Sequence, residues 1–367
     1  MRILVVFGTR PEAIKLAPVV HALQGASDRF EVAVCTTAQH REMLDSVLRI
    51  FEITPDHDLN LMTPDQSLET LTAAVLQRFP PVLERERPDA VLVQGDTTTA
   101  MAAALCAHYR QIDVGHVEAG LRSGNLLAPF PEEANRRIIT QIATWNFAPT
   151  IGARENLLRA GADPDSISVT GNTVVDALLE VVEKAKRLER PPQPILHVPW
   201  NGSRGGLITG HRRESHGAPL LRICEAFRQL AEANRDVHFV YPVHLNPRVK
   251  GPVNEALGGV ENFHLTEPLD YLAMVWAMDR AHLIITDSGG IQEEAPALGV
   301  PVLVTREVTE RTEGVEAGTA KLVGADPDTI VAEAQRLLDD AEAHRAMARA
   351  VNPYGDGHAS ERILEFL

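Results

Sequence analysis

Short runs of apolar, mostly β-branched residues alternate with amphipathic stretches along the whole chain of 367 residues. Several of the runs are apolar throughout, a pattern that predicts parallel strands covered by helices on both faces. We expect strands at Ile3–Phe7, Val32–Cys35, Ala90–Gln94, Ile112–Val117, Ile167–Val169, Gly206–Ile208, Val237–Tyr241, Leu283–Thr286 and Val302–Thr305. We expect helices at Arg41–Phe51, Leu68–Glu86, Thr97–Tyr109, Pro219–Ala233 and Asp328–Ala350. This order predicts an α/β, doubly wound architecture.

The strand and helix pattern falls into two series, one over residues 1–170 and one over residues 205–325. A chain of this length is enough for about two domains. Between the series, Arg190–Gly205 holds four prolines and shows no periodicity, so composition alone predicts the linker there. Near the end, Asn352-Pro353 stops the last long helix, and Ser360 is a plausible N-cap for a final short helix.

Charge and composition narrow the function classes. The formal net charge of −15 disfavours binding to nucleic acid or to an anionic membrane, so an anionic ligand would need a local basic cleft. No apolar run approaches the ~18 residues of a membrane span. The three cysteines form no CxxC pair, which predicts neither a disulfide framework nor a zinc site. We expect a cytoplasmic protein.

Polar clusters directly follow the predicted strands of the first half, where open α/β sheets bind their ligands. Arg10 and Lys15 follow the first strand and could neutralise a phosphate at a helix N-terminus, although a solvated helix start is equally ordinary. Asp96 and Glu118 follow two strands that we expect to be neighbours. Two close carboxylates shift their pKa values apart and provide one proton acceptor and one donor.

A third acid comes from Pro129-Phe130-Pro131-Glu132-Glu133, which the prolines predict to be a braced loop. We expect at least one of these two glutamates to be solvated at the surface.

The second half carries the groups suited to a diphosphate. His211 follows a strand and precedes Arg212 and Arg213, a natural diphosphate clamp, whereas His244 alone would be interpreted as structural. Ser288, Gly289 and Gly290 open a helix, where backbone N–H groups form an anion nest. Glu294 could accept a hydrogen bond from a sugar or ribose hydroxyl, and Arg306 and Arg311 add cations at the same edge.

Several motifs are missing from the sequence. There is no GxGxxG, GxxxxGK[ST], HExxH or GxSxG, and the fourteen histidines show no metal-ligand spacing. The sequence therefore predicts proton chemistry on a bound diphosphate, with no metal and no NAD.

Ten segments together resemble one family. They are FGTRPEAIKLAP, TAQHREMLD, QGDTTTA, GHVEAGLRSGN, PFPEEANRR, TGNTVVDAL, TGHRRES, YPVHLNP, TDSGGIQEEAPALGVPVLV and NPYGDG. In order and over nearly the full chain, they resemble the non-hydrolysing UDP-N-acetylglucosamine 2-epimerases of bacteria.

The resemblance implies a glycosyltransferase-B-like fold, with two Rossmann-like domains and the active site in the cleft between them. It implies an N-terminal domain of residues 1–170 plus 352–367, which carries the catalytic acids. Residues 171–351 would form the UDP-binding domain. The Pro191–Pro199 stretch then becomes a loop within this second domain.

The family interconverts UDP-GlcNAc and UDP-ManNAc without a cofactor, by eliminating UDP to 2-acetamidoglucal and adding it back. The resemblance further implies a homodimer, activation by a second UDP-GlcNAc and a role in cell-surface polysaccharide synthesis. By motif position, the catalytic residues would be Asp96, Glu118, Glu132 and His211. The substrate-binding residues would be Arg10, Lys15, Ser288, Gly289, Gly290, Glu294 and Arg311. The activator contacts would be Gln39, His40, Arg212 and His244.

Three other functions stay open at this point. A hydrolysing 2-epimerase would release free ManNAc and UDP, and the TAQHREMLD and TGHRRES segments favour the non-hydrolysing type because they resemble the activator site. A glycosyltransferase of the same fold would need an acceptor pocket. A nucleotide-binding protein without catalysis would not need acids at strand ends.

Overall fold

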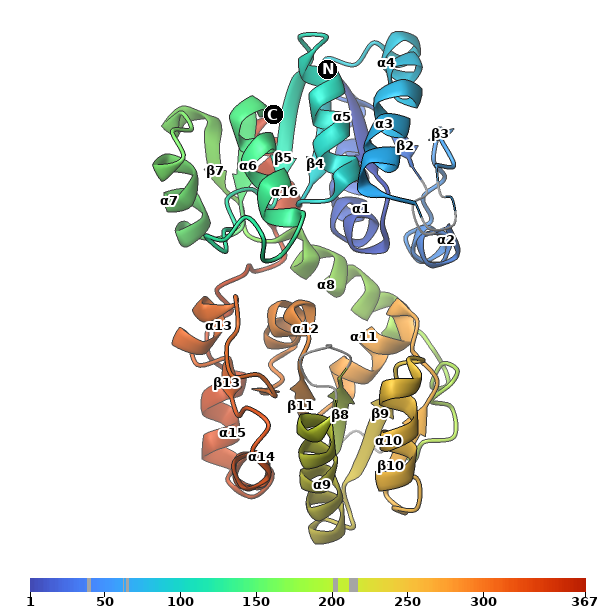
Figure 1. Ribbon diagram of the computed structural model, residues 1–367, viewed down its shortest axis with the longest axis vertical. Coiled ribbons are helices and arrows are strands. Elements are labelled where there is room, and N and C mark those ends of the chain that lie inside the picture. Colours follow the sequence, from blue (N-terminus) through green and yellow to red (C-terminus); the bar gives the residue numbers. More distant parts are fainter. Residues whose placement is uncertain (38–40, 62, 64–65, 201–203, 211–216) are drawn as a thin grey trace. The chain divides into compact units, whose positions relative to one another are not determined.

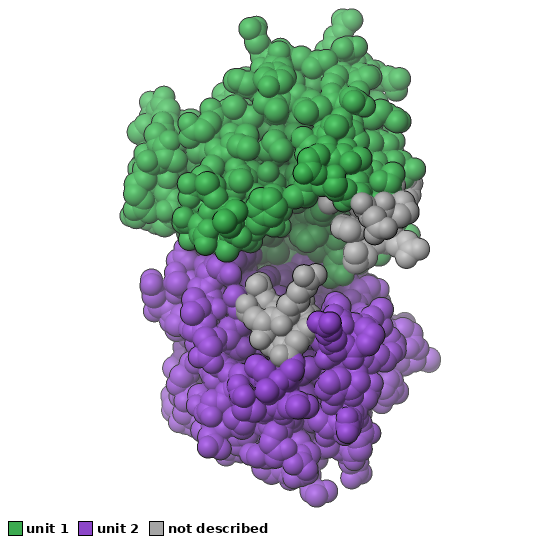
Figure 2. Space-filling model, viewed as in Figure 1, with its two compact units in different colours: residues 1–180, 354–367 green, residues 181–353 purple. Residues whose placement is uncertain are grey.

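The computed structural model describes residues 1–37, 41–61, 63, 66–200, 204–210 and 217–367. They form two compact units, residues 1–180 with 354–367 and residues 181–353 (Figure 2). The division falls inside one helix, α8 (Thr173–Lys186), and the chain re-enters the first unit at Tyr354. Each unit is built on its own parallel sheet, so the α/β fold class predicted from the sequence is confirmed (Figure 1).

The described part of the first unit holds a seven-stranded sheet in the order β3-β2-β1-β4-β5-β6-β7. Each neighbouring pair is parallel. The strands are β1 (Arg2–Phe7), β2 (Glu31–Thr36), β3 (His57–Asp58), β4 (Ala90–Gln94), β5 (Asp113–Val117), β6 (Trp145–Ala148) and β7 (Ile167–Val169). Central strands β1 and β4 are almost wholly buried, as expected when helices cover both faces of a sheet.

Helices cover this sheet on both sides, with α1, α2 and α16 packed together on one face and α3, α5 and α6 on the other (Figure 1). The helices are α1 (Arg10–Gly25), α2 (Arg41–Ile50), α3 (Leu68–Arg78), α4 (Pro80–Glu86), α5 (Thr98–His108), α6 (Glu132–Ile142), α7 (Ile151–Arg159), α8 and α16 (Ala359–Phe366). A short 3₁₀ turn, η1 (Pro164–Ser166), precedes β7.

In its described residues, the second unit repeats this plan with a six-stranded parallel sheet in the order β10-β9-β8-β11-β12-β13. Its strands are β8 (Gly205–Thr209), β9 (His238–Pro242), β10 (Phe263–Thr266), β11 (Leu283–Thr286), β12 (Val302–Val304) and β13 (Ala320–Leu322). Its helices are α9 (Ala218–Ala233), α10 (Pro247–Leu257), α11 (Tyr271–Arg280), α12 (Gly289–Glu294), η3 (Ala295–Leu298), α13 (Thr312–Glu316), α14 (Pro327–Asp339) and α15 (Ala341–Ala348).

Both sheets reverse their strand order at one point, between β1 and β4 in the first unit and between β8 and β11 in the second. The connections from the two strands at such a point leave in opposite directions, which opens a crevice at the carboxyl ends. The fold therefore places a candidate site at the loops that follow β1 and β4 in the first unit and β11 in the second.

All nine predicted strands are present with small shifts of their ends, but four strands escaped the sequence analysis. These are β3, β6, β10 and β13, each of two to four residues and each at or next to a sheet edge. Such short segments carry too few apolar positions to show a period.

Two helices predicted as continuous are broken. Leu68–Glu86 divides at Phe79, because Pro80 and Pro81 offer no backbone N–H to the preceding turn. Asp328–Ala350 divides at Asp340, whose side chain accepts hydrogen bonds from the N–H groups of the next turn and so starts α15.

The start of the C-terminal helix also differs from the prediction. The residue before the first turn is His358, and Ser360 lies inside α16. Asp176 of α8 caps the helix instead, accepting from the N–H groups of Ala359 at 3.2 Å and Ser360 at 2.7 Å. The helix cap predicted for Ser360 is therefore provided by a side chain about 180 residues away in the sequence.

Candidate functional site

The loop between β1 and α1 is fastened by a buried glutamate. Glu12 accepts hydrogen bonds from the N–H groups of Gly8 and Thr9, at 3.1 and 2.8 Å, and from the Thr97 hydroxyl at 2.6 Å. It is only 1% exposed, and burial raises its pKa above the ordinary value. Because Thr97 follows β4, this contact ties together the two loops that flank the reversal point of the sheet.

Glu118 directly follows β5, has a strained backbone conformation and pairs with a cation. Its φ of 62° lies in the left-handed region that non-glycine residues rarely adopt, and such strain is typical of functional positions. The Lys15 ammonium of α1 forms an ion pair with its carboxylate, and both side chains are largely buried. Arg10, at the start of the same helix, is partly exposed.

Asp96 follows β4, and Glu118 follows the neighbouring strand β5. Gln94 and Val117 are partners across the two strands, and the Gly95 N–H donates to the Val117 carbonyl at 2.9 Å. The predicted adjacency of the two strands is therefore confirmed. The Asp96 carboxylate forms an ion pair with Arg136 of α6, and its side chain is 21% exposed.

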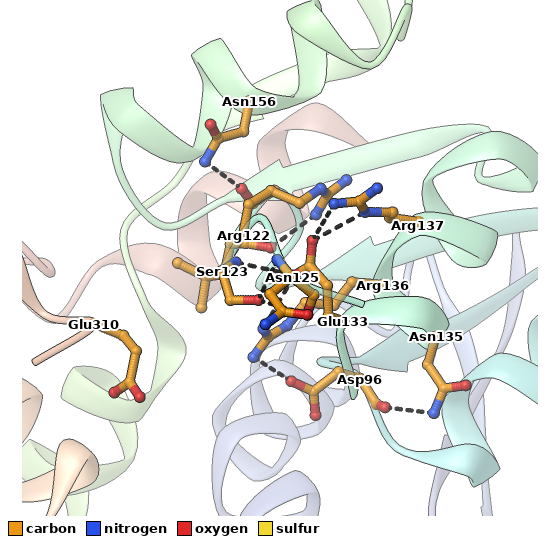
Figure 3. A network of polar contacts seen from close by, with 12 residues as sticks. Asp96, Arg122, Ser123, Asn125, Glu133, Asn135, Arg136, Arg137, Asn156 and Glu310 are labelled. Atoms are coloured by element: carbon orange, nitrogen blue, oxygen red, sulfur yellow. Dashed lines mark hydrogen bonds and ion pairs between the residues drawn. The ribbon is translucent and has the colours of Figure 1, made fainter. Parts of the chain in front are cut away.

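The two glutamates at the start of α6 differ from the prediction, because they lie in a helix and not in a loop. Glu133 is fully buried and is therefore not solvated. Burial alone would raise its pKa, but the Ser123 N–H and the Arg137 guanidinium lower it below the ordinary value (Figure 3). Glu132 is half-buried, and no group in the described residues bonds to its buried Oε2.

His116, which the sequence analysis did not single out, lies within β5, two residues before Glu118. It is fully buried, and its Nε2–H donates to the Gly95 carbonyl at 2.7 Å. Burial lowers the pKa of His116 to about 4, so the ring is neutral near pH 7. Among the described residues nothing bonds to Nδ1. Its position inside a strand with an apolar pattern hid it from motif analysis.

The turn after β11 in the second unit leads into α12, and at its start Ser288 is half-buried, Gly289 is buried and Gly290 is exposed. The Ser288 N–H donates to the Thr286 hydroxyl at 2.9 Å, so this N–H already has an acceptor in the chain. The N–H groups of Gly289 and Gly290, as the first two residues of the helix, have no acceptor within it. The turn can present these two groups to an anion.

Arg311 lies against the same turn. A Cβ on Gly289 would stand 3.4 Å from the Arg311 guanidinium carbon, so the guanidinium lies in van der Waals reach of the turn. The Arg311 Nε donates to Glu293 at 2.8 Å. The neighbouring Glu310 accepts a hydrogen bond from Arg306. Burial alone would raise the pKa of Glu310, but the pairing with Arg306 lowers it to about 2.

Glu294 is buried and accepts a hydrogen bond from the Tyr271 hydroxyl at 2.8 Å. Tyr271 opens α11, and nothing in the local sequence linked it to the site. His244 is exposed, and its Nδ1 accepts from the Asn246 N–H at 3.1 Å. The predicted residues Gln39, His40, His211 and Arg212 lie outside the described residues.

The described residues show neither a candidate metal site nor a membrane-spanning helix. The described residues contain no group of three or more His, Cys, Asp or Glu side chains placed to hold a metal ion. Within the described ranges, each helix is too short or too polar to cross a bilayer.

The chain is similar to known proteins over its whole length. Residues 21–367 match the family described as UDP-N-acetylglucosamine 2-epimerase. The chain is 56% identical to a probable UDP-N-acetylglucosamine 2-epimerase of Ralstonia nicotianae, over 99% of this chain and 97% of that protein. It is 53% identical to the UDP-N-acetylglucosamine 2-epimerase of Escherichia coli K12, over 100% of this chain and 98% of that protein.

A crystal structure of the UDP-GlcNAc 2-epimerase of Neisseria meningitidis bound to UDP-GlcNAc matches with a TM-score of 0.90 and 49% identity, covering 100% of this chain and 99% of that one. With acids at the ends of adjacent strands in one unit and a glycine turn with a cation in the other, the chain therefore belongs to the UDP-N-acetylglucosamine 2-epimerase family and is an isomerase.

Proposed function

We propose that this enzyme interconverts UDP-GlcNAc and UDP-ManNAc without hydrolysing them. The observation that carries the proposal is the placement of Asp96 and Glu118 at the ends of adjacent strands, in a chain about half identical to a relative crystallised with UDP-GlcNAc. Two carboxylates so placed suit the removal and return of a proton on opposite faces of a sugar ring.

In the proposed reaction, a carboxylate takes the proton from C2 of the sugar. The C–H electron pair forms the C1–C2 double bond, and the C1–oxygen bond breaks with its electrons passing to UDP. The products of this step are 2-acetamidoglucal and UDP. A carboxylic acid then protonates C2 from the other face while UDP adds back to C1. Asp96, Glu118 and Glu132 share these acid and base roles, and His211 assists the diphosphate.

The second unit holds the nucleotide in this proposal. The N–H groups of Gly289 and Gly290 and the Arg311 guanidinium face phosphate oxygens, beside Ser288, and Glu294 receives a ribose hydroxyl. Arg10 and Lys15 of the first unit add positive charge. Lys15 has a second task, because its pairing with Glu118 holds that carboxylate in place before substrate arrives.

The finer features of the family complete the proposal. The two domains meet at about residue 170, with residues 352–367 returning to the first, and the protein is a cytoplasmic homodimer. A second UDP-GlcNAc acts as activator through Gln39, His40, Arg212 and His244. The exposure of the His244 side chain is consistent with a ligand contact.

The product spectrum with UDP-GlcNAc in heavy water tests the function. We expect UDP-ManNAc and UDP-GlcNAc, both with deuterium at C2, because the proton removed exchanges with solvent before it is returned. Free ManNAc and UDP as the main products would instead identify the hydrolysing reaction. Transfer of the sugar only when an acceptor is added would identify a glycosyltransferase.

Replacing the acids tests their assignment. Asp96→Asn and Glu118→Gln should each slow C2 exchange by about 10²-fold or more, since each removes one proton-transfer group, while UDP binding stays measurable. Asp113→Asn, at the opposite end of β5, is the control and should exchange at the normal rate. Normal turnover in both site variants would refute the assignment.

A further inference from the structure

Asp96 is held at two points by consecutive residues of α6. The Arg136 guanidinium forms an ion pair with Oδ2 of its carboxylate, and the Asn135 side-chain amide donates to its backbone carbonyl at 2.8 Å (Figure 3). Because Asn135 and Arg136 are adjacent on one helix, they fix the backbone and the carboxylate of Asp96 against the same turn.

Arg136 is itself oriented by a buried carboxylate one turn earlier. Its Nη1 lies 3.8 Å from Oε2 of Glu133, whose side chain has no solvent exposure. The other oxygen of Glu133 accepts from both Nε and Nη2 of Arg137, at 2.9 Å each, and the Ser123 N–H donates to Oε2 at 3.0 Å. Glu133 is thus an anchor, and the Arg136 guanidinium lies between it and Asp96.

The burial of this pair separates it from an ordinary surface ion pair. The side chains of Arg136 and Asp96 are 13% and 21% exposed, whereas Arg137 on the same helix is 45% exposed. Exposed pairs contribute little to stability because water screens them, and shielding from water strengthens the interaction. Arg136 engages Oδ2, and in the described residues no group donates to Oδ1 of Asp96.

We propose that Arg136 is a positioning residue for Asp96, holding the carboxylate so that Oδ1 is left for the proton at C2 of the sugar. This inference rests on the proposed function, because it assigns Arg136 to the placement of a proposed proton-transfer group. The same helix carries Glu132 in its first turn, so α6 places two of the three acids.

Matched substitutions on α6 test the proposal in the full-length enzyme. Arg136→Ala frees Asp96 to turn away, and we expect kcat for epimerisation to fall by about 10²-fold with KM nearly unchanged. Arg137→Ala also removes a cation that pairs with Glu133, but it leaves Asp96 held, so its kcat should fall by less than about fivefold.

Restoring a cation at this point should restore activity. Arg136→Lys should recover part of the lost kcat, and guanidinium ion, added below the range that unfolds the protein, should accelerate Arg136→Ala but not Arg137→Ala. A structural role alone predicts equal losses in both alanine variants and no rescue, and that result would overturn the proposal.

The wild-type enzyme separates the two proposals. If it epimerises UDP-GlcNAc while Arg136→Ala matches it in kcat, only the positioning role fails. If the wild type does not act on UDP-GlcNAc, the proposed function fails, and the positioning role fails with it. Should Arg136→Ala not fold, as loss of its cooperative thermal transition would show, the kcat of Arg136→Gln decides. This variant keeps much of the side chain without the charge, and normal activity there refutes the inference.

Discussion

Buried polar side chains around the acids meet the cost of burial in different ways. Glu12 keeps three donors, and burial raises its pKa. Glu133 is paired with arginine, and His116 stays neutral because burial lowers its pKa to about 4. Each of these arrangements fixes the position of the group that it bonds to, because loss of the hydrogen-bond partner of a buried polar group costs about 1–3 kcal/mol of stability.

The neutral His116 predicts a pH dependence of stability. Between pH 6.5 and about 4 the unfolded chain takes up a proton at this ring and the folded chain does not, so stability falls as pH drops through this range. Below pH 4 both states are protonated and this contribution is flat. The full effect is roughly 3 kcal/mol, from the shift in pKa.

Urea unfolding at pH 7 and pH 4.5, with His116→Gln as the comparison, measures this effect. Glutamine does not titrate, so the variant should lose less stability on acidification than the wild type. An equal loss in both proteins would mean that His116 does not contribute.

The three cysteines give a second prediction at this scale. Cys35, Cys106 and Cys224 are free and buried, and burial raises the pKa values of Cys35 and Cys224 to about 12. Thiolates are the reactive form, so a thiol reagent should modify none of the three in the folded protein and all three in urea. Rapid modification in the absence of denaturant would contradict the burial.

At the scale of elements, caps supplied by distant residues decide where helices begin. Asp340 starts α15 locally, but α16 depends on Asp176 of α8, which accepts from two of its N–H groups. Phe366 at the end of α16 packs edge-on against Phe147 of β6 at 5.6 Å between ring centres. The last helix is thus an integral part of the first unit.

Removal of the α16 cap should destabilise the protein. Asp176→Ala leaves the N–H groups of Ala359 and Ser360 without an acceptor, and we expect a loss of about 0.5–2 kcal/mol, whereas Asp176→Asn should lose less because an amide oxygen still accepts. Thermal unfolding of the three proteins measures the difference. Equal midpoints for Asp176→Ala and the wild type would exclude the capping role.

At the scale of the whole molecule, a chain with a net charge of −15 has to bind an anionic nucleotide through local cations. In the described residues these cations are paired with carboxylates: Lys15 with Glu118, and Arg311 with Glu293. Such pairs keep the cations in position without ligand, and in our proposal the phosphates compete with the carboxylates for them.

The contribution of Arg311 can be measured directly. Arg311→Ala should weaken UDP binding by roughly 1.5–3 kcal/mol through loss of a charge-assisted contact, with little change in the rate of C2 exchange at saturation. Titration calorimetry gives the affinity, and Arg336→Ala, an exposed arginine of α14, is the control. An unchanged affinity for UDP would show that Arg311 does not belong to the nucleotide site.

Much of the fold was predictable from local pattern. The strands that precede Gly8 and Asp96 are apolar over four or five residues, and the polar cluster begins close to the point where each run ends. The strands that precede Glu118 and Ser288 are less regular or shorter but end in the same way at a polar cluster. The helix breaks at Phe79 and Asp340 are marked by recognisable residues. The helical periodicity of apolar positions nevertheless continues on both sides of each break, so the pattern predicted one continuous helix at each place.

The sequence by itself thus determined the α/β class, the loops that carry polar groups and the family, because these depend on residues close together in the chain. Tertiary structure alone decided which cation meets which carboxylate, that Glu133 is buried, and that His116 is buried and neutral. These contacts join residues from different strands and helices. Their energies depend on the water that folding excludes, which no local pattern encodes.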